Sequence, residues 1–383
     1  MKILFDATAI SLPLSGIGRY ALELSRYLPS EPGIAGVRYL QGKQVVSDID
    51  LENLSPPQSS GAARRWLKPL LPYRLVLGPY RRYRARALAL SLRSYEDYLY
   101  YSPNFSIPPL SGKSVVTLHD LSVFHFPEFH PRDRVNYLRD QINNSVERAD
   151  RLVTDSLFVR DELLHLFPLP PQQVTAIPLG LDAAFRPHAS EELAVIMAQY
   201  KLRPGGYLLS VGTIEPRKNL AGLLQAYSLL APALRKQYPL VIAGAYGWNS
   251  GPLMEQVRQL GQSGEVIYLD YVPEQHLPGL YAGAALFAYL SFYEGFGLPV
   301  LEAMGSGVPV VCAASSALPD LCDGSALQVD PHDIPAMAVA LQRGLEDEAW
   351  RLAAVEQGLA RSAAFCWQRT TAALVDVFRE VAE

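Results

Sequence analysis

The chain has 383 residues, 49% of them hydrophobic and 19% charged, and its formal net charge is −4 at pH 7. This composition excludes a disordered chain, and the small net charge argues against a general nucleic-acid binder. Because one hydrophobic core rarely supports so many residues, we expect two domains. Three cysteines, Cys312, Cys322 and Cys366, are too few and too irregularly spaced for a disulfide framework or a zinc site, so we expect buried, reduced thiols.

The N-terminal stretch from Met1 to Asp6 reaches an acidic residue after three apolar ones, which is not the pattern of a signal peptide. The sequence also lacks a run of about eighteen uncharged apolar residues, the length that a membrane-spanning helix needs. We therefore expect a cytoplasmic protein, either soluble or peripheral on the inner face of the cytoplasmic membrane.

The chain opens with a strand, a glycine-containing turn and a helix. Residues 3–10 are apolar enough for a buried strand, and Gly16 and Gly18 lead into a helical pattern. The two glycines resemble the start of a dinucleotide-binding fingerprint, but Ala21 stands where its third glycine belongs. The sequence thus disfavours a dehydrogenase. By themselves, the two glycines need serve only a tight turn.

A basic, aromatic-rich segment follows. No acidic residue occurs between Asn53 and Tyr95, whereas nine arginines and lysines between residues 64 and 93 are interleaved with tryptophan, tyrosine and leucine. Such a segment attracts anionic lipid headgroups while its aromatic rings sit at the interface. Residues 64–93 therefore predict contact with an anionic membrane surface or a lipid-linked acceptor. An ordinary solvated face and nucleic-acid binding are the alternatives.

Polar residues follow the next predicted strands. His119 and Asp120 lie at the carboxyl end of the strand over residues 114–120, where open α/β sheets place ligands. Together with His125 and His130 they match no usual metal-ligand spacing, so no metal site is expected. The nearby Gly112-Lys113-Ser114 fails as a phosphate-binding loop because a strand, and not a helix, follows it.

The second half repeats the pattern of strand, loop and helix. A strand over residues 207–212 precedes Arg217 and Lys218, and a helix is predicted over 220–230. A guanidinium can bind a diphosphate bidentately, and an ammonium adds a point charge. A solvated pair of surface cations is the alternative. Further strands are predicted over 240–244, 266–271 and 286–290.

The chemistry concentrates in residues 291–311. Glu294 and Glu302 are separated by seven residues, and we expect a helix to start near Pro299, with Glu294 in the preceding loop and Glu302 in its first turn. Gly305 and Gly307 predict the helix end, before a buried strand over residues 308–311. The N–H groups at such a helix start can bind a pyrophosphate. Alternatively, Glu302 only complements the helix dipole and Glu294 is solvated.

The strings Glu-Gly-Phe-Gly-Leu-Pro at 294–299 and Glu-Ala-Met-Gly-Ser-Gly at 302–307 resemble the E-x7-E motif of retaining, nucleotide-sugar-dependent glycosyltransferases of family 4. The resemblance implies the α/β GT-B fold, in which two Rossmann-like doubly wound domains face an interdomain cleft. We expect residues 1–188 to form an acceptor domain and 189–362 a donor domain. An amphipathic helix over 363–383 would cross back to the first domain, as it does in this family.

The resemblance also implies roles for individual residues. His119, Arg217, Lys218 and Glu294 would be the catalytic set, with His119 lining the donor sugar and Glu294 holding its hydroxyls. Glu302 would hold the ribose, and the cations would stabilise the departing diphosphate without a cofactor or metal. The acceptor hydroxyl would attack from the front face. Further donor-binding residues would be Gly16, Gly18, Thr213, Gly244, Tyr271, Val272, Leu277, Phe296, Gly297 and Leu298. Thr213 stands where one common form of the family has an arginine, so either Arg217 or Thr213 compensates.

The form Gly-Thr-x-x-Pro-Arg-Lys-Asn at 212–219 resembles bacterial mannosyl- and rhamnosyltransferases of surface polysaccharide assembly. We therefore expect transfer of mannose or a deoxyhexose such as rhamnose, from a GDP-linked donor, to a lipid-linked or polysaccharide acceptor. A UDP- or dTDP-sugar donor, a nucleotide-sugar epimerase of the same fold and a silent glycan-binding scaffold are the alternatives. A glycosidase is disfavoured, because its two carboxylates flank a scissile bond across about 5–10 Å, whereas these two belong to one helix entrance.

Overall fold

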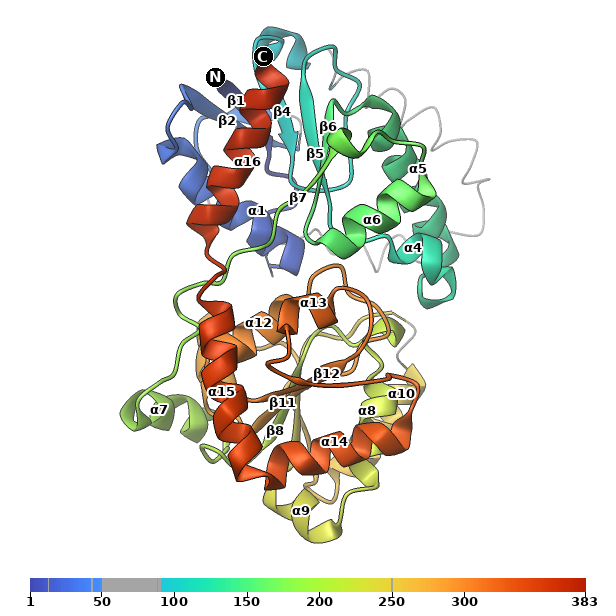
Figure 1. Cartoon of the computed structure of the whole chain (residues 1–383), viewed down its shortest axis with the longest axis vertical. Helices are drawn as coiled ribbons and strands as arrows, with labels where there is room; N and C mark the ends of the chain where they lie inside the picture. The colour runs from blue at the N-terminus through green and yellow to red at the C-terminus, as the bar shows by residue number, and fades with distance from the viewer. Residues whose placement is uncertain (13, 43, 50–87, 89–90, 249–250) are drawn as a thin grey trace, which may run out of the picture. The chain divides into compact units, whose positions relative to one another are not determined.

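A computed structural model describes residues 1–383 except 13, 43, 50–87, 89–90 and 249–250. The chain divides into two compact units (Figure 1). The first comprises residues 1–119, 136–177 and 367–383, and the second comprises residues 120–135 and 178–366. The second unit thus takes in residues 178–188, ahead of the boundary expected near Ala189, together with the short segment 120–135.

Within the described residues, the first unit holds a sheet in the order β3-β2-β1-β4-β5-β6-β7. Its strands are β1 (Lys2–Asp6), β2 (Gly36–Gln41), β3 (Gln44–Val46), β4 (Leu99–Ser102), β5 (Ser114–Leu118), β6 (Arg151–Thr154) and β7 (Val174–Ala176). All neighbours are parallel except β2 and β3, and Ile3 of β1 lies between Val37 and Leu99. Strands β1, β4 and β5 are almost wholly buried, which fits a parallel sheet covered on both faces.

The helices of the first unit are α1 (Gly16–Tyr27), α6 (Leu157–Leu166), α16 (Trp367–Ala382) and residues 136–148 of α5 (Arg132–Arg148). The short turns are η1 (Leu28–Ser30), η2 (Arg93–Tyr95) and η4 (Pro171–Gln173). Helix α16 packs on α1 and buries Leu374 and Phe378. The Phe378 ring meets Tyr101 of β4 edge-on, with 5.1 Å between the ring centroids. The C-terminal helix is therefore part of the first unit's core.

The second unit holds the order β10-β9-β8-β11-β12-β13, and every described pair is parallel. The strands are β8 (Leu208–Val211), β9 (Leu240–Ala243), β10 (Val266–Tyr268), β11 (Leu286–Tyr289), β12 (Val310–Ala313) and β13 (Leu327–Val329). Relative to chain order this is 3-2-1-4-5-6, the doubly wound order. Its direction reverses between β8 and β11, and the loops after these two strands flank the crevice where such sheets bind ligands.

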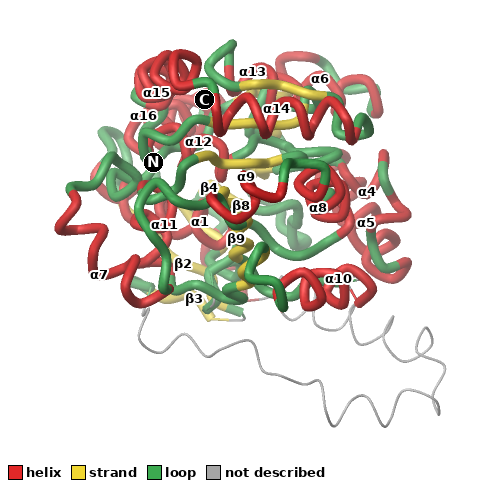
Figure 2. Tube along the Cα trace, turned by 90° about the horizontal axis from the view of Figure 1, so that it is seen from below, coloured by secondary structure: helices red, strands yellow, loops and turns green. Residues whose placement is uncertain are grey.

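Each strand of the second unit is followed along the chain by one or two helices, and Figure 2 colours the helices red and the strands yellow. Helix α8 packs against α14, and α12 packs against α11 and α15. The helices are α4 (Ser122–His125), α7 (Ser190–Tyr200), α8 (Leu220–Ser228), α9 (Pro232–Gln237), α10 (Gly251–Gly261), α11 (Leu277–Ala282), α12 (Leu298–Gly305), α13 (Leu318–Cys322), α14 (Ile334–Glu346) and α15 (Glu348–Ser362). The turns are η3 (Pro127–Phe129), η5 (Pro216–Lys218) and η6 (Glu274–His276).

Several expected elements differ from those in the structure. Strand β1 ends at Asp6, because Thr8 donates its N–H and hydroxyl to the Asp6 carboxylate and turns the chain there. Strand β2 was not predicted, because polar residues interrupt its apolar pattern. The Cys366 side chain is only half-buried, whereas a buried thiol was expected. Most of the basic segment 64–93 lies outside the described residues. No described helix is long and apolar enough to span a bilayer.

Candidate functional site

The loops after β8 and β11 bring two cations onto one carboxylate. Lys218 Nζ donates to both carboxylate oxygens of Glu294, at 2.7 and 3.0 Å. Arg217 Nη1 donates to Glu294 Oε2 at 3.2 Å and to the Tyr293 carbonyl at 2.7 Å. These residues lie at the sheet's reversal point, so topology places the predicted diphosphate cations and the first glutamate of the motif together.

Local structure fixes the two cations. Pro216 starts the turn η5, and Asn219 adopts a left-handed conformation (φ 51°) that ends this turn and caps α8 through Gly222 N–H. Glu215 accepts from Arg217 Nη2 at 2.9 Å, and the Tyr289 hydroxyl accepts from Lys218 Nζ at 2.6 Å. Each cation thus has a second partner besides Glu294, which restrains its side chain.

Charge and burial act against each other in this cluster. Burial raises the pKa of the Glu294 carboxyl, but Lys218 and Arg217 outweigh it and hold that pKa below its ordinary value. Burial is also the largest influence on Lys218 and lowers its pKa, against the opposite pull of Glu294. The contact between Lys218 and Glu294 is a buried ion pair.

A polar chain continues from this cluster. Asp120 accepts from the N–H and the hydroxyl of Ser122, at 3.0 and 2.7 Å. Burial raises the Asp120 pKa, but Arg217 and these hydrogen bonds hold it below its ordinary value. The Ser122 hydroxyl proton goes to Asp120, so His130 Nε2, at 3.0 Å, must be the donor to this oxygen. Burial lowers the pKa of His130, and its Nδ1 is buried without a partner among the described residues.

The motif helix α12 starts as expected, with one correction. Gly297 (φ 107°) caps it, Pro299 stands in its first turn, and Gly307 (φ 73°) follows its end in a left-handed conformation. Because the helix begins at Leu298, Glu302 is its fifth residue and lies in the second turn, so the prediction of a first-turn position was wrong. Glu302 is buried. Phe296 is buried too, and its ring meets Phe365 edge-on.

His119 belongs to the first unit and follows β5. Its Nδ1 lies 2.7 Å from Asp155 Oδ2, and its Nε2 lies 2.8 Å from the Pro103 carbonyl. The Tyr20 ring packs edge-on against the imidazole, with 4.9 Å between the centroids. Gly16 and Gly18 occupy the first turn of α1, capped by the Ser15 hydroxyl, in the same unit. The helix α6 is capped by Ser156, which leaves Asp155 for His119.

The other predicted donor-binding residues lie in the second unit. Thr213 and Tyr271 are exposed, Val272 is buried, and Leu277 begins α11. Gly244 (φ 154°) makes the close approach expected of it, since a Cβ there would lie 1.9 Å from the Gly212 carbonyl oxygen. The donor-binding roles of these residues stay predictions.

Sequence reasoning did not single out several residues that build the cluster. Glu215 and Tyr289 hold the cations, and the Ser316 hydroxyl accepts from the Glu294 N–H at 2.8 Å. Glu215 stands inside the Gly-Thr-x-x-Pro-Arg-Lys-Asn string, and this position was a usable signal. Tyr289 had no such signal in the sequence, because this residue lies in an apolar strand.

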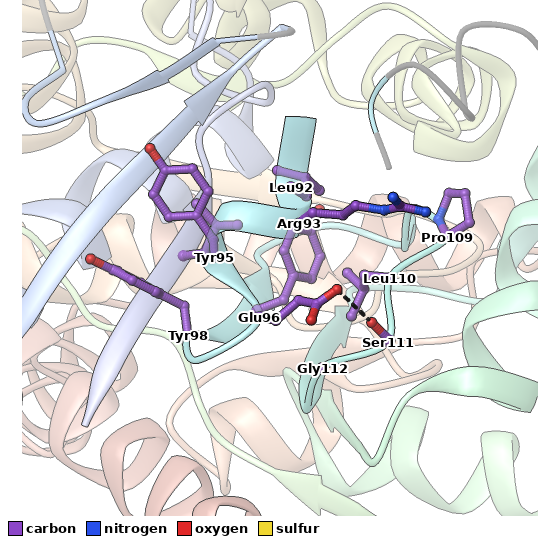
Figure 3. Close-up of a pocket in the computed structure, with 11 residues that line it drawn as sticks. Leu92, Arg93, Tyr95, Glu96, Tyr98, Pro109, Leu110, Ser111 and Gly112 are labelled. Atoms are coloured by element: carbon purple, nitrogen blue, oxygen red, sulfur yellow. Dashed lines mark hydrogen bonds between the residues drawn. The ribbon is translucent and has the colours of Figure 1, made fainter. Parts of the chain in front are cut away.

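The described residues contain no group of three or more histidine, cysteine or acidic residues that could hold a metal ion. A cavity of about 310 Å³ lies elsewhere, in the first unit (Figure 3). Tyr98 and Gly112, which precede β4 and β5, are among its lining residues, and Glu96 accepts from the Ser111 hydroxyl beside them. The cavity is therefore on the amino-terminal side of these strands, away from the carboxyl ends where doubly wound sheets bind ligands.

Two doubly wound units, with a cation pair and an E-x7-E helix at one reversal point, define a glycosyltransferase of the GT-B fold. Residues 198–361 match the family model "Glycosyl transferases group 1", and residues 71–185 match "Glycosyltransferase Family 4". The chain is 39% identical over 380 residues to O-antigen chain mannosyltransferase B of Escherichia coli, covering 99% of this chain and 100% of that protein. The chain therefore belongs to glycosyltransferase family 4.

Solved structures agree on the fold. WaaG, a glycosyltransferase involved in lipopolysaccharide biosynthesis, matches with a TM-score of 0.73 and 15% identity, over 98% of this chain and 99% of WaaG. Anabaena Alr3699/HepE in complex with UDP-glucose matches with a TM-score of 0.72 and 16% identity, over 99% of both chains. At these identities the likeness shows the GT-B fold alone.

Proposed function

We propose that this glycosyltransferase transfers mannose, or a deoxyhexose such as rhamnose, from a GDP-linked donor to a lipid-linked or polysaccharide acceptor, with retention of configuration. The full-length similarity to an O-antigen mannosyltransferase supports the sugar and the setting, which is bacterial surface glycan synthesis on the cytoplasmic side of the membrane. The observation that carries the proposal is the convergence of Arg217 and Lys218 on Glu294 at the reversal point of the donor sheet.

In the proposed reaction, negative charge develops on the departing nucleoside diphosphate. Arg217, Lys218 and the N–H groups at the start of α12, near Phe296, Gly297 and Leu298, stabilise this charge electrostatically. The acceptor hydroxyl attacks from the front face, and its proton passes to the departing phosphate. The cations do the work for which other enzymes use a divalent ion, so the proposed reaction needs neither a metal nor a cofactor.

The two glutamates bind the uncharged ends of the donor in this proposal. Glu294 accepts from the sugar hydroxyls and Glu302 from the ribose, while His119 lines the sugar. Gly16, Gly18, Thr213 and Gly244 contact the donor's phosphates or the acceptor, and Tyr271, Val272 and Leu277 lie near the base. No carboxylate acts as a nucleophile.

Calorimetry with GDP, UDP and dTDP tests the donor. We expect GDP to bind most tightly. If UDP binds more tightly than GDP, the donor is instead a UDP-sugar, the class of donor bound in the UDP-glucose complex of HepE. If no nucleoside diphosphate binds, the proposal fails. Release of the diphosphate from the sugar nucleotide without any acceptor would favour an epimerase.

The membrane contact is a separate part of the proposal and rests on the basic segment 64–93. Sedimentation with vesicles tests it. We expect the protein to bind vesicles that contain anionic phospholipid and not neutral ones. Equal sedimentation with both would remove the membrane from the proposal while leaving the transfer reaction untouched.

A further inference from the structure

The Lys218 ammonium already holds an anion in this structure. It makes three contacts, with the Tyr289 hydroxyl at 2.6 Å and with the two Glu294 carboxylate oxygens at 2.7 and 3.0 Å. An ammonium has three N–H donors. A phosphate oxygen can therefore reach Lys218 only if one of these contacts is given up.

The charges around Lys218 and Glu294 also indicate that a phosphate must displace a group already present. Two cations, Arg217 and Lys218, face three carboxylates, Glu215, Glu294 and Asp120. This group of five carries a net charge of −1 before any ligand arrives. A diphosphate adds at least two more negative charges, and a buried site tolerates such repulsion poorly.

Of these three carboxylates, Glu294 is the one that a phosphate would displace from Lys218. Glu215 contacts Arg217, and Asp120 is held by both the N–H and the hydroxyl of Ser122. Glu294 instead bridges Arg217 and Lys218, while its backbone is fixed by the Ser316 hydroxyl and by the Ala317 N–H, which donates to the Glu294 carbonyl. A change of its side-chain rotamer would therefore break none of these backbone hydrogen bonds.

We propose that Glu294 is an internal counter-ion, which occupies the place of a donor phosphate on Lys218 and exchanges with it when the donor binds. This inference rests on the proposed function. The displaced carboxylate becomes free to accept from the sugar hydroxyls. An intact sugar nucleotide thus compensates for the lost ion pair, whereas the sugar-free diphosphate product does not. After transfer, the return of Glu294 to Lys218 promotes release of the product.

Calorimetric titration of Glu294→Gln with inorganic pyrophosphate, GDP and GDP-mannose tests the exchange. This substitution keeps the shape of the side chain and removes its charge, so pyrophosphate should bind about tenfold to a hundredfold more tightly than to the native protein, the range of one charged hydrogen bond. The preference for GDP-mannose over GDP should shrink. Glu346→Gln, at an exposed carboxylate on α14 of the same unit, controls for loss of one negative charge and should change neither.

A second variant, Glu294→Asp, keeps the test usable if Glu294→Gln does not fold. It keeps the negative charge but moves the carboxylate away from Lys218 by the length of one methylene. We expect an intermediate gain in pyrophosphate affinity. If neither variant binds pyrophosphate more tightly than the native protein, the counter-ion role is wrong. If nucleoside diphosphates do not bind at all while pyrophosphate binding tightens, the counter-ion role stands and the proposed glycosyl donor is wrong.

Discussion

His119 and Asp155 follow the adjacent strands β5 and β6 and join Nδ1 to Oδ2 across 2.7 Å. The other ring nitrogen faces the Pro103 carbonyl at 2.8 Å. The ring is thus held between two hydrogen-bond acceptors, a carboxylate and a backbone carbonyl. The first unit therefore presents an imidazole of fixed orientation at the carboxyl ends of its strands.

Removing the carboxylate should loosen this ring. In Asp155→Asn the side chain keeps its shape but loses the charge of the hydrogen bond that orients the ring, so we expect the turnover number of sugar transfer to fall by about tenfold to a hundredfold. Steady-state kinetics with the identified donor checks this. Asp161→Asn, at an exposed carboxylate on α6, is the matched control and should leave the rate unchanged. A normal rate in Asp155→Asn would show that the contact between His119 and Asp155 has no part in transfer.

Lys218→Ala should weaken binding of the nucleoside diphosphate by about tenfold to a hundredfold, because a charged hydrogen bond is lost. Burial lowers the Lys218 pKa below its ordinary 10.5. A lysine loses its charge as pH rises through its pKa, so native affinity should decline at a lower alkaline pH than an ordinary lysine would give. Lys218→Arg stays charged and should lose this decline. Calorimetry across the pH range measures both effects.

Glu294→Ala should abolish sugar transfer, with a fall of about a hundredfold or more, because the sugar loses its hydroxyl acceptor and two buried cations lose the carboxylate that they share. A transfer assay with radiolabelled sugar nucleotide measures the rate. Circular dichroism of the same preparation confirms that the variant is folded. Transfer within a fewfold of the native rate would remove Glu294 from the catalytic set.

Metal removal should leave the enzyme active. The proposed reaction stabilises the departing diphosphate with Arg217 and Lys218, so we expect the rate to be unchanged after dialysis against EDTA and in its presence. Added Mg²⁺ or Mn²⁺ restores activity only if a metal takes part. A rate that falls with EDTA and returns with a divalent cation would therefore contradict the cation-pair mechanism.

Gly244→Ala should destabilise the second unit. The new Cβ would lie 1.9 Å from the Gly212 carbonyl oxygen, in a positive-φ backbone region that L-residues rarely adopt. We expect a loss of about 2–4 kcal/mol in the free energy of unfolding, measured by urea denaturation. Gly36→Ala, on β2, meets no described atom within 4 Å and should cost far less. Equal losses would show that steric crowding is not the cause.

Much of the donor unit could be predicted from sequence, because β8, β9 and β11 are mainly apolar runs, with only Ser210 of β8 polar among them, and polar loops follow. The pairing of Lys218 with Glu294 could not, since it joins residues 76 apart and depends on β11 lying beside β8. The contact of His119 with Asp155 could not be predicted either, since it joins residues 36 apart at the ends of the neighbouring strands β5 and β6. Glu302 fell in the second turn because the helix started one residue before Pro299.

Helix α16 has a consequence for how the chain is made. It supplies Leu374 and Phe378 to the first unit, and Arg379 donates to the Pro32 carbonyl beside α1. Translation delivers these side chains only after every residue of the second unit has been made. Until α16 has been made, the apolar face of α1 stays uncovered and is exposed to chaperones and to aggregation. A chain truncated before residue 367 should therefore aggregate through its first unit, although its second unit can still fold.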